Sequence, residues 1–183
     1  EMLRSLVGSE MCIRDSNILY TYIAPFLAVA GLGDRTDLVL LVFGVASLLG
    51  IWIVGVLIDR HLRTLALAST LLFGLAASVL AVAGEAPALV YIAIGIWGVA
   101  FGGAPTLFQT ALAKTAGDEA ADVAQSMLVT AWNMAIAGGG LIGGILLDRL
   151  GAAAFAPALL VLVAASLIAV WAARRHGFPA VSG

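Results

Sequence analysis

The stretch LVLLVFGVASLLGIWIVGVLI, residues 38–58, decides the fold because it runs for 21 residues without a charged side chain. About 20 helical residues, rising 1.5 Å each, cross the roughly 30 Å hydrocarbon core of a bilayer. Four further uncharged runs of similar or greater length occupy residues 64–84, 86–113, 123–147 and 151–173. Spanning segments must be helices or closed barrels, and these runs lack the alternation of barrel strands. The sequence therefore predicts an all-α polytopic membrane protein.

The overall composition supports the same fold class. Hydrophobic residues make up 62% of the chain and charged residues 11%, with a mean hydropathy of +1.10. A soluble domain carries about 25% charged residues, so this chain could not cover a water-exposed surface. The net charge of -2 leaves no basic surface for nucleic acid, and one cysteine and two separated histidines make no disulfide framework or metal cluster. We expect no cofactor, no metal and no enzyme activity.

The first residues do not resemble a natural protein. The string SLVGSEMCIRDS, residues 5–16, resembles a translated adapter of the kind used to tag sequencing libraries. We therefore interpret residues 1–16 as a non-native segment and residues 17–183 as a C-terminal six-helix transmembrane bundle. Residues 17–30 would form only about 21 Å of helix, so we expect a truncated first helix with sequence missing upstream.

The pattern of polar breaks predicts six helices joined by short loops. Their expected ranges are residues 17–30, 37–58, 64–84, 86–113, 123–147 and 152–173. Pro105 lies inside the fourth range, where the loss of one backbone hydrogen bond predicts a kink. Close glycine pairs, Gly98/Gly102 and Gly139/Gly143 among them, predict tight helix packing.

The loop charges predict the orientation in a bacterial inner membrane. Loops on one side carry Arg60, Arg63, Lys114, Arg174 and Arg175, and loops on the other side carry Arg35 and Arg149. Because basic residues concentrate in cytoplasmic loops, the C-terminus is expected in the cytoplasm.

Two helix ends carry the same short motif. GVLIDR ends the second predicted helix at Asp59 and Arg60, and GILLDR ends the fifth at Asp148 and Arg149. These sites are three helices apart, so they would face opposite sides of the membrane, as in a three-plus-three inverted repeat. The alternative is a chance similarity between glycine-rich helix ends. The helix dipole disfavours a carboxylate at a helix C-terminus by roughly 0.3–1 kcal/mol, so we expect Asp59 to have a compensating partner.

The segment GVLIDRHLR, residues 55–63, is similar to the loop motif of the major facilitator superfamily, although Leu62 replaces its usual glycine. YTYIAPF, residues 20–26, and the glycine-rich run 133–151 resemble its bacterial drug, sugar and nucleoside efflux branches. The resemblance implies the C-terminal half of a transporter, spans seven to twelve, that exports a small solute by alternating access with protons. The implied partners are the bilayer, a missing N-terminal six-helix half, a small-molecule substrate and protons.

The charge-free spans leave neutral side chains as candidates for the substrate cavity, which spans seven, eight, ten and eleven line in the resembled family. These candidates are Tyr20, Tyr22, Ser47, Trp97, Phe101, Gln109, Trp132 and Asn133. Helix packing is the alternative role for the tryptophans, and a helix–helix hydrogen bond is the alternative for Asn133.

The repeated motif supplies the candidates for a gate. These are Gly55, Asp59, Arg60 and Arg63, with Gly144, Asp148 and Arg149 in the second copy. A solvated loop that anchors topology is the alternative to a cytoplasmic latch. The alternative to transport is a non-transporting membrane scaffold or subunit.

Overall fold

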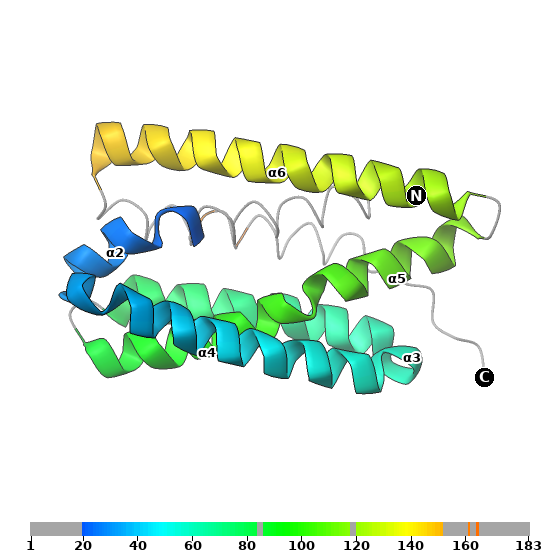
Figure 1. The fold of residues 1–183 in the computed structure, drawn as a ribbon, viewed down its shortest axis with the longest axis horizontal. Helices are drawn as coiled ribbons and strands as arrows, with labels where there is room; N and C mark the ends of the chain where they lie inside the picture. The colour runs from blue at the N-terminus through cyan, green and yellow to red at the C-terminus, as the bar shows by residue number, and fades with distance from the viewer. Residues whose placement is uncertain (1–19, 84–85, 118–119, 152–160, 162–163, 165–183) are drawn as a thin grey trace.

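The helices of this chain are seen in a computed structural model, which describes residues 20–83, 86–117, 120–151, 161 and 164. The elements are α2 (Ile23–Val29), the 3-10 turn η1 (Gly33–Arg35), α3 (Thr36–Ala83), α4 (Pro87–Gly102), α5 (Ala104–Ala116) and α6 (Ala121–Leu150) (Figure 1). No strand occurs within these ranges, so the predicted all-α class is confirmed. Residues 1–16 and most of the predicted sixth helix lie outside the described residues.

Helix α3 folds back on itself at His61. That residue has φ −131° and ψ 27°, which breaks the helix into a first leg, residues 36–60, and a second leg, residues 62–83. Figure 1 shows the two legs running in opposite directions from a turn at one end of the molecule. The legs correspond to the predicted second and third helices, and the polar DRHLR segment forms a tight turn between them.

The fourth predicted helix is broken where Pro105 predicts a kink. Helix α4 ends at Gly102, Gly103 joins the two segments, and Pro105 lies in the first turn of α5. Proline fits the first turn of a helix because its missing N–H would have no intrahelical partner there. The kink is confirmed, and α5 leaves the α4 axis to rise toward α6 (Figure 1).

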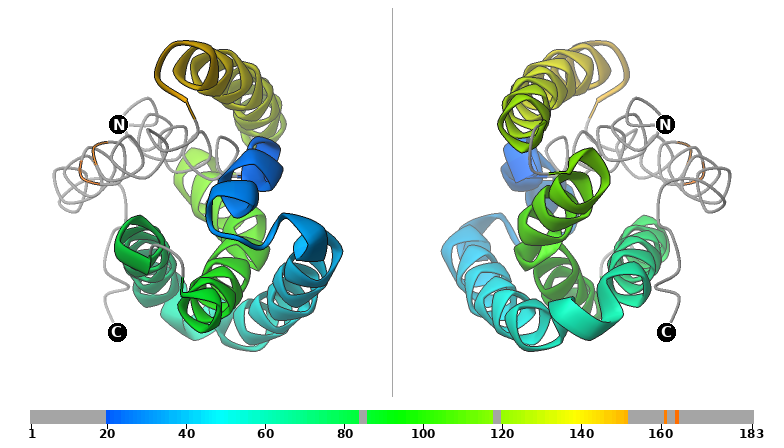
Figure 2. Two further views of the ribbon diagram at one scale, coloured as in Figure 1. Left: turned by 90° about the vertical axis from the view of Figure 1, so that its left-hand side faces the viewer. Right: turned by 90° about the vertical axis from the view of Figure 1, so that its right-hand side faces the viewer.

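Helix α4 packs between the two legs of α3 and forms the core with them (Figure 2). Val90, Ile94 and Trp97 of α4 lie at 1% exposure or less. Val39 of the first leg and Phe73 of the second leg belong to the same cluster. The core therefore ties three spanning segments together.

Glycines bring α4 and the first leg into backbone contact. A Cβ atom on Gly98 would lie 2.6 Å from the carbonyl oxygen of Phe43, closer than real Cβ atoms approach. A Cβ on Gly102 would collide with the carbonyl of Ser47, and one on Gly50 with the carbonyl of Val99. The packing role predicted for Gly98 and Gly102 is confirmed, and we call these contacts the glycine seam.

Helix α6 runs opposite to the first leg of α3. In Figure 1 the first leg ends at the turn near one end of the molecule and α6 ends near the other. Asp59 and Asp148 lie in those two terminal turns, so the repeated motif faces opposite sides. This arrangement agrees with the predicted inverted repeat.

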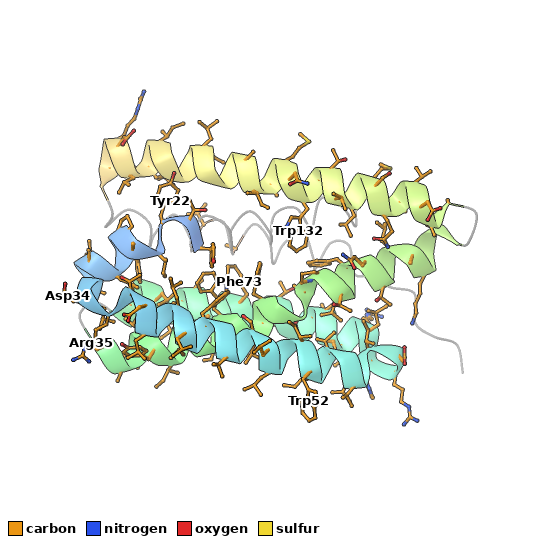
Figure 3. The ribbon with its side chains drawn as sticks, viewed as in Figure 1. Tyr22, Asp34, Arg35, Trp52, Phe73 and Trp132 are labelled. Carbon is orange, nitrogen blue, oxygen red and sulfur yellow. The ribbon has the colours of Figure 1, made fainter. Side chains whose placement is uncertain are left out.

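The described helices suit a bilayer. The stretches 33–80, with both legs of α3, 87–114 and 121–150 are long and apolar enough to cross a membrane. Large apolar side chains cover the outer face of α3, and Trp52 is 68% exposed there (Figure 3). In water such a surface would be unstable, whereas lipid solvates it, so the chain is an integral membrane protein.

Gly102→Ala is expected to destabilise the protein because its Cβ would push α4 away from Ser47. Overpacking of this kind costs about 1–3 kcal/mol of unfolding free energy. Gly44→Ala, on the first leg of α3 that carries Ser47, is the control because nothing lies within 4 Å of its Cβ. Thermal unfolding in detergent should show a lower Tm for Gly102→Ala alone. Equal Tm values for both variants would contradict the glycine seam.

Candidate functional site

Three of the candidate cavity residues meet around one phenylalanine that the sequence analysis missed. The ring centroid of Phe43 lies 4.5 Å from Trp97, 5.9 Å from Tyr20 and 6.1 Å from Phe101. Ser47 lies one turn further along the first leg and donates a 2.8 Å hydrogen bond to the Phe43 carbonyl. Phe43 and Ser47 share a helix face at a spacing of four residues, a signal that could have identified Phe43.

Trp97 lies in the packed core of this aromatic group. Its side chain is 1% exposed, and its Nε1 has no hydrogen-bond partner among the described residues. A buried unpaired donor costs about 1–3 kcal/mol, so packing of the indole against Phe43 must hold it in place. This position matches the packing role that the sequence analysis left open for Trp97.

A separate hollow lies between α5 and α6 and contains three other candidates. Its volume is about 220 Å³, and its lining residues are Pro105, Gln109, Leu128, Val129, Trp132 and Asn133. Figure 3 shows Trp132 extending from α6 toward the α4–α5 break. We call this space the α5–α6 hollow. It combines an indole with one amide from each helix, and none of the described residues that line it is charged.

The shape of the hollow follows from the way α5 meets α6. Leu112 of α5 packs against Ala124 and Leu128 of α6 near the connection between the helices. The Gln125 side chain adds a 3.0 Å hydrogen bond from Nε2 to the main-chain oxygen of Gln109. Toward Pro105 the helices diverge, because the break at Gly103 carries the chain toward α4 (Figure 1). The hollow occupies this diverging end.

The side-chain amides of Asn133 and Gln109 differ in their hydrogen bonding. Asn133 is exposed, and its Nδ2 donates a 2.8 Å hydrogen bond to the Val129 carbonyl in the same helix. Among the described residues, Asn133 therefore makes a hydrogen bond within α6 instead of the bond to another helix that was the alternative to substrate binding. The Gln109 side chain is exposed and has no hydrogen bond to another described residue.

Tyr22, the last candidate, fastens α2 to the glycine-rich part of α6 (Figure 3). Its hydroxyl donates a 2.6 Å hydrogen bond to the Gly140 carbonyl. A Cβ on Gly143 would collide with the Tyr22 ring, and one on Gly144 would lie 3.1 Å from its hydroxyl. Gly143 therefore accommodates a tyrosine ring, so Tyr22 contributes a tertiary contact whatever else it binds.

The candidate gate residues lie at element ends. Asp59, Arg60 and Arg63 are exposed around the α3 turn, and space is open around Gly55. Asp148 and Arg149 are exposed in the last turn of α6. The described ranges contain no ion pair for Asp59 or Arg60, and no cluster of three potential metal ligands. The compensating partner expected for Asp59 is therefore not among the described residues.

Tyr22→Phe is expected to lower the unfolding free energy by about 0.5–1.5 kcal/mol because it removes the bond to Gly140. Gly143→Ala should also destabilise, since its Cβ would displace the Tyr22 ring. Gly140→Ala is the control, with nothing within 4 Å of its Cβ and an intact carbonyl. Thermal unfolding in detergent measures all three. A Tm of Gly143→Ala no lower than that of Gly140→Ala would contradict this contact.

A solved structure has the same fold as this chain. The in meso crystal structure of the POT family transporter PepTSo superimposes with a TM-score of 0.78 at 20% sequence identity. The match covers 95% of this chain and 37% of that one.

Sequence comparisons show the family. The chain is 33% identical over 170 residues to the transcription regulatory protein OpdE of Pseudomonas aeruginosa, covering 91% of this chain and 42% of OpdE. It is 30% identical over 152 residues to the purine ribonucleoside efflux pump NepI of Escherichia coli K12, covering 82% of this chain and 38% of NepI. The chain thus spans about two fifths of these relatives. Residues 11–182 match the sequence model of the Major Facilitator Superfamily, and the chain belongs to that family.

Proposed function

We propose that this chain is the C-terminal six-helix half of a secondary transporter that exports a small solute by alternating access. Residues 17–183 form this half, and residues 1–16 are a non-native segment. Family membership and the similarity to NepI, whose name describes an efflux pump, support export. The share of each relative that the chain spans supports a partner half of comparable size.

The observation that carries this proposal is the neutral lining of the α5–α6 hollow. Its polar groups are the amides of Gln109 and Asn133, and its aromatic surface is Trp132. Stacking on an aromatic side chain contributes about 1–3 kcal/mol per nucleic-acid base and tolerates different rings. An indole between two amides therefore suits an uncharged solute with a flat heteroaromatic ring. The purine ribonucleosides in the name of NepI have this chemistry.

Proton coupling requires a titratable group, and none of the described residues that line the hollow has a titratable side chain. We therefore place the proton-binding side chain in the N-terminal half. In this arrangement the described half binds the neutral ring and the other half binds the proton. Closure of the two halves around the solute couples solute binding to proton binding.

Charge placement supports a cytoplasmic C-terminus in a bacterial inner membrane. Arg60 and Arg63 flank the α3 turn, and Lys114 lies in the last turn of α5. Figure 1 shows these element ends at the same end of the molecule, whereas η1 with Arg35 lies at the other. Basic residues favour the cytoplasmic side. Asp59 and Arg60 would then form a latch to the other half at the cytoplasmic surface.

A second candidate function is a membrane protein that does not transport. The name of OpdE, a transcription regulatory protein, favours it. Such a protein would need no accessible polar hollow, so the lining of the α5–α6 hollow favours transport.

Trp132→Ala in the full-length protein should reduce export of a labelled purine nucleoside about tenfold, because it removes the stacking surface. Met134→Ala is the control, since Met134 is 66% exposed on another face of α6. Inverted membrane vesicles with matched protein levels measure the rates. An inserted wild-type protein without nucleoside transport would favour the non-transporting candidate.

Asp59→Ala should reduce transport severalfold without changing membrane insertion, because it removes one side of the proposed latch. Asp37→Ala is the matched control: Asp37 is an exposed carboxylate in the first turn of the same leg, at the opposite end. Insertion is followed by the amount of protein in washed membranes. Normal transport by Asp59→Ala would contradict the latch and favour the alternative, a solvated loop that anchors the topology.

A further inference from the structure

The Asn133 amide in the α5–α6 hollow is oriented by a hydrogen bond within its own helix. Nδ2 lies 2.8 Å from the Val129 carbonyl oxygen and donates to it. Turning the amide over would place Oδ1 against that oxygen, where two acceptors repel each other. While this bond is made, one N–H and the acceptor Oδ1 remain for a solute.

Gln109, on the opposite helix, is not restricted in this way. Its side chain lines the same hollow and has no hydrogen bond to another described residue, since the Gln125 contact uses the main-chain oxygen. A free amide can rotate to present either its oxygen or its NH₂ group. Gln109 can thus adapt to many ring edges, whereas Asn133 cannot.

Trp132 and Asn133 can contact different parts of a flat ring, Trp132 its face and Asn133 its edge. They are consecutive residues on α6, separated by about 100° around the helix, and both line the hollow. A ring that stacks on the indole turns its edge, rather than its face, toward the surrounding polar groups. The amide of Asn133 is the group on α6 that can pair with that edge.

We propose that Asn133 is a specificity-determining residue that selects heteroaromatic solutes with an N–H donor beside a ring acceptor. This inference rests on the proposed export of a ring-bearing solute. Asparagine pairs in this two-bond manner with the amino group and adjacent nitrogen of adenine. A ring with acceptors alone would pair with the free N–H at most, and would leave Oδ1 without a partner.

The test compares two nucleosides that differ by one amino group, adenosine and purine riboside. Purine riboside lacks the exocyclic amine and is smaller, so steric exclusion cannot explain its rejection. The full-length protein in proteoliposomes should transport adenosine about tenfold faster at low concentration, within the roughly 5- to 150-fold range for one stranded polar group. Equal rates for the two nucleosides would overturn the inference and leave the proposed export standing. Transport of neither would overturn both.

Variants then locate the preference. Asn133→Leu should reduce the adenosine rate to that of purine riboside, whereas Met134→Leu should leave both rates unchanged. Gln109→Leu should lower both rates and keep their ratio, because the unrestrained Gln109 amide can turn its NH₂ group toward a ring that carries acceptors alone. Loss of the preference in Gln109→Leu, or its persistence in Asn133→Leu, would overturn the assignment to Asn133. The wild-type comparison of the two nucleosides decides the ring preference even if a variant fails to fold.

Discussion

Close contact between α4 and the first leg of α3 supports the rest of this structure. In lipid, two helices gain little from the hydrophobic effect against each other, so packing has to hold them together. At Gly98 and Gly102 the missing side chains let the α4 backbone lie on the carbonyls of Phe43 and Ser47. This seam fixes α4 between the two legs and sets the positions of Trp97 and the α4–α5 break.

The hollow follows from this seam in two steps. The seam ends at Gly102 and Gly103, where a Cβ on Gly103 would collide with Val54 of the first leg. From that point Pro105 starts a new helix axis, and α5 crosses to α6, where Leu112 and Leu128 meet. A straight fourth helix would have continued along the first leg. The space between α5 and α6 is thus a consequence of tight packing elsewhere.

The sequence predicted the spans that the structure describes, the kink at Pro105 and the repeated helix ends, because each depends on local charge, backbone chemistry or spacing. It did not predict that Tyr22 reaches Gly140 while Gln109 joins Asn133 in one hollow. Those pairings depend on helix rotation and crossing angle, and a uniformly apolar helix has no periodic pattern that reveals either. Phe43 was missed because a phenylalanine in an apolar run resembles any lipid-facing side chain.

The positions of the charged side chains in the described helices bear on how the hollow could bind a solute. Charged side chains of the described helices lie near the helix ends, at η1, the α3 turn, and the ends of α5 and α6. In the proposed function, a neutral ring entering the hollow would exchange water for an indole and two amides, and none of the described lining residues would have to lose the hydration of a charge. Under this proposal, binding of the ring would stay weak enough for its release on either side of the membrane.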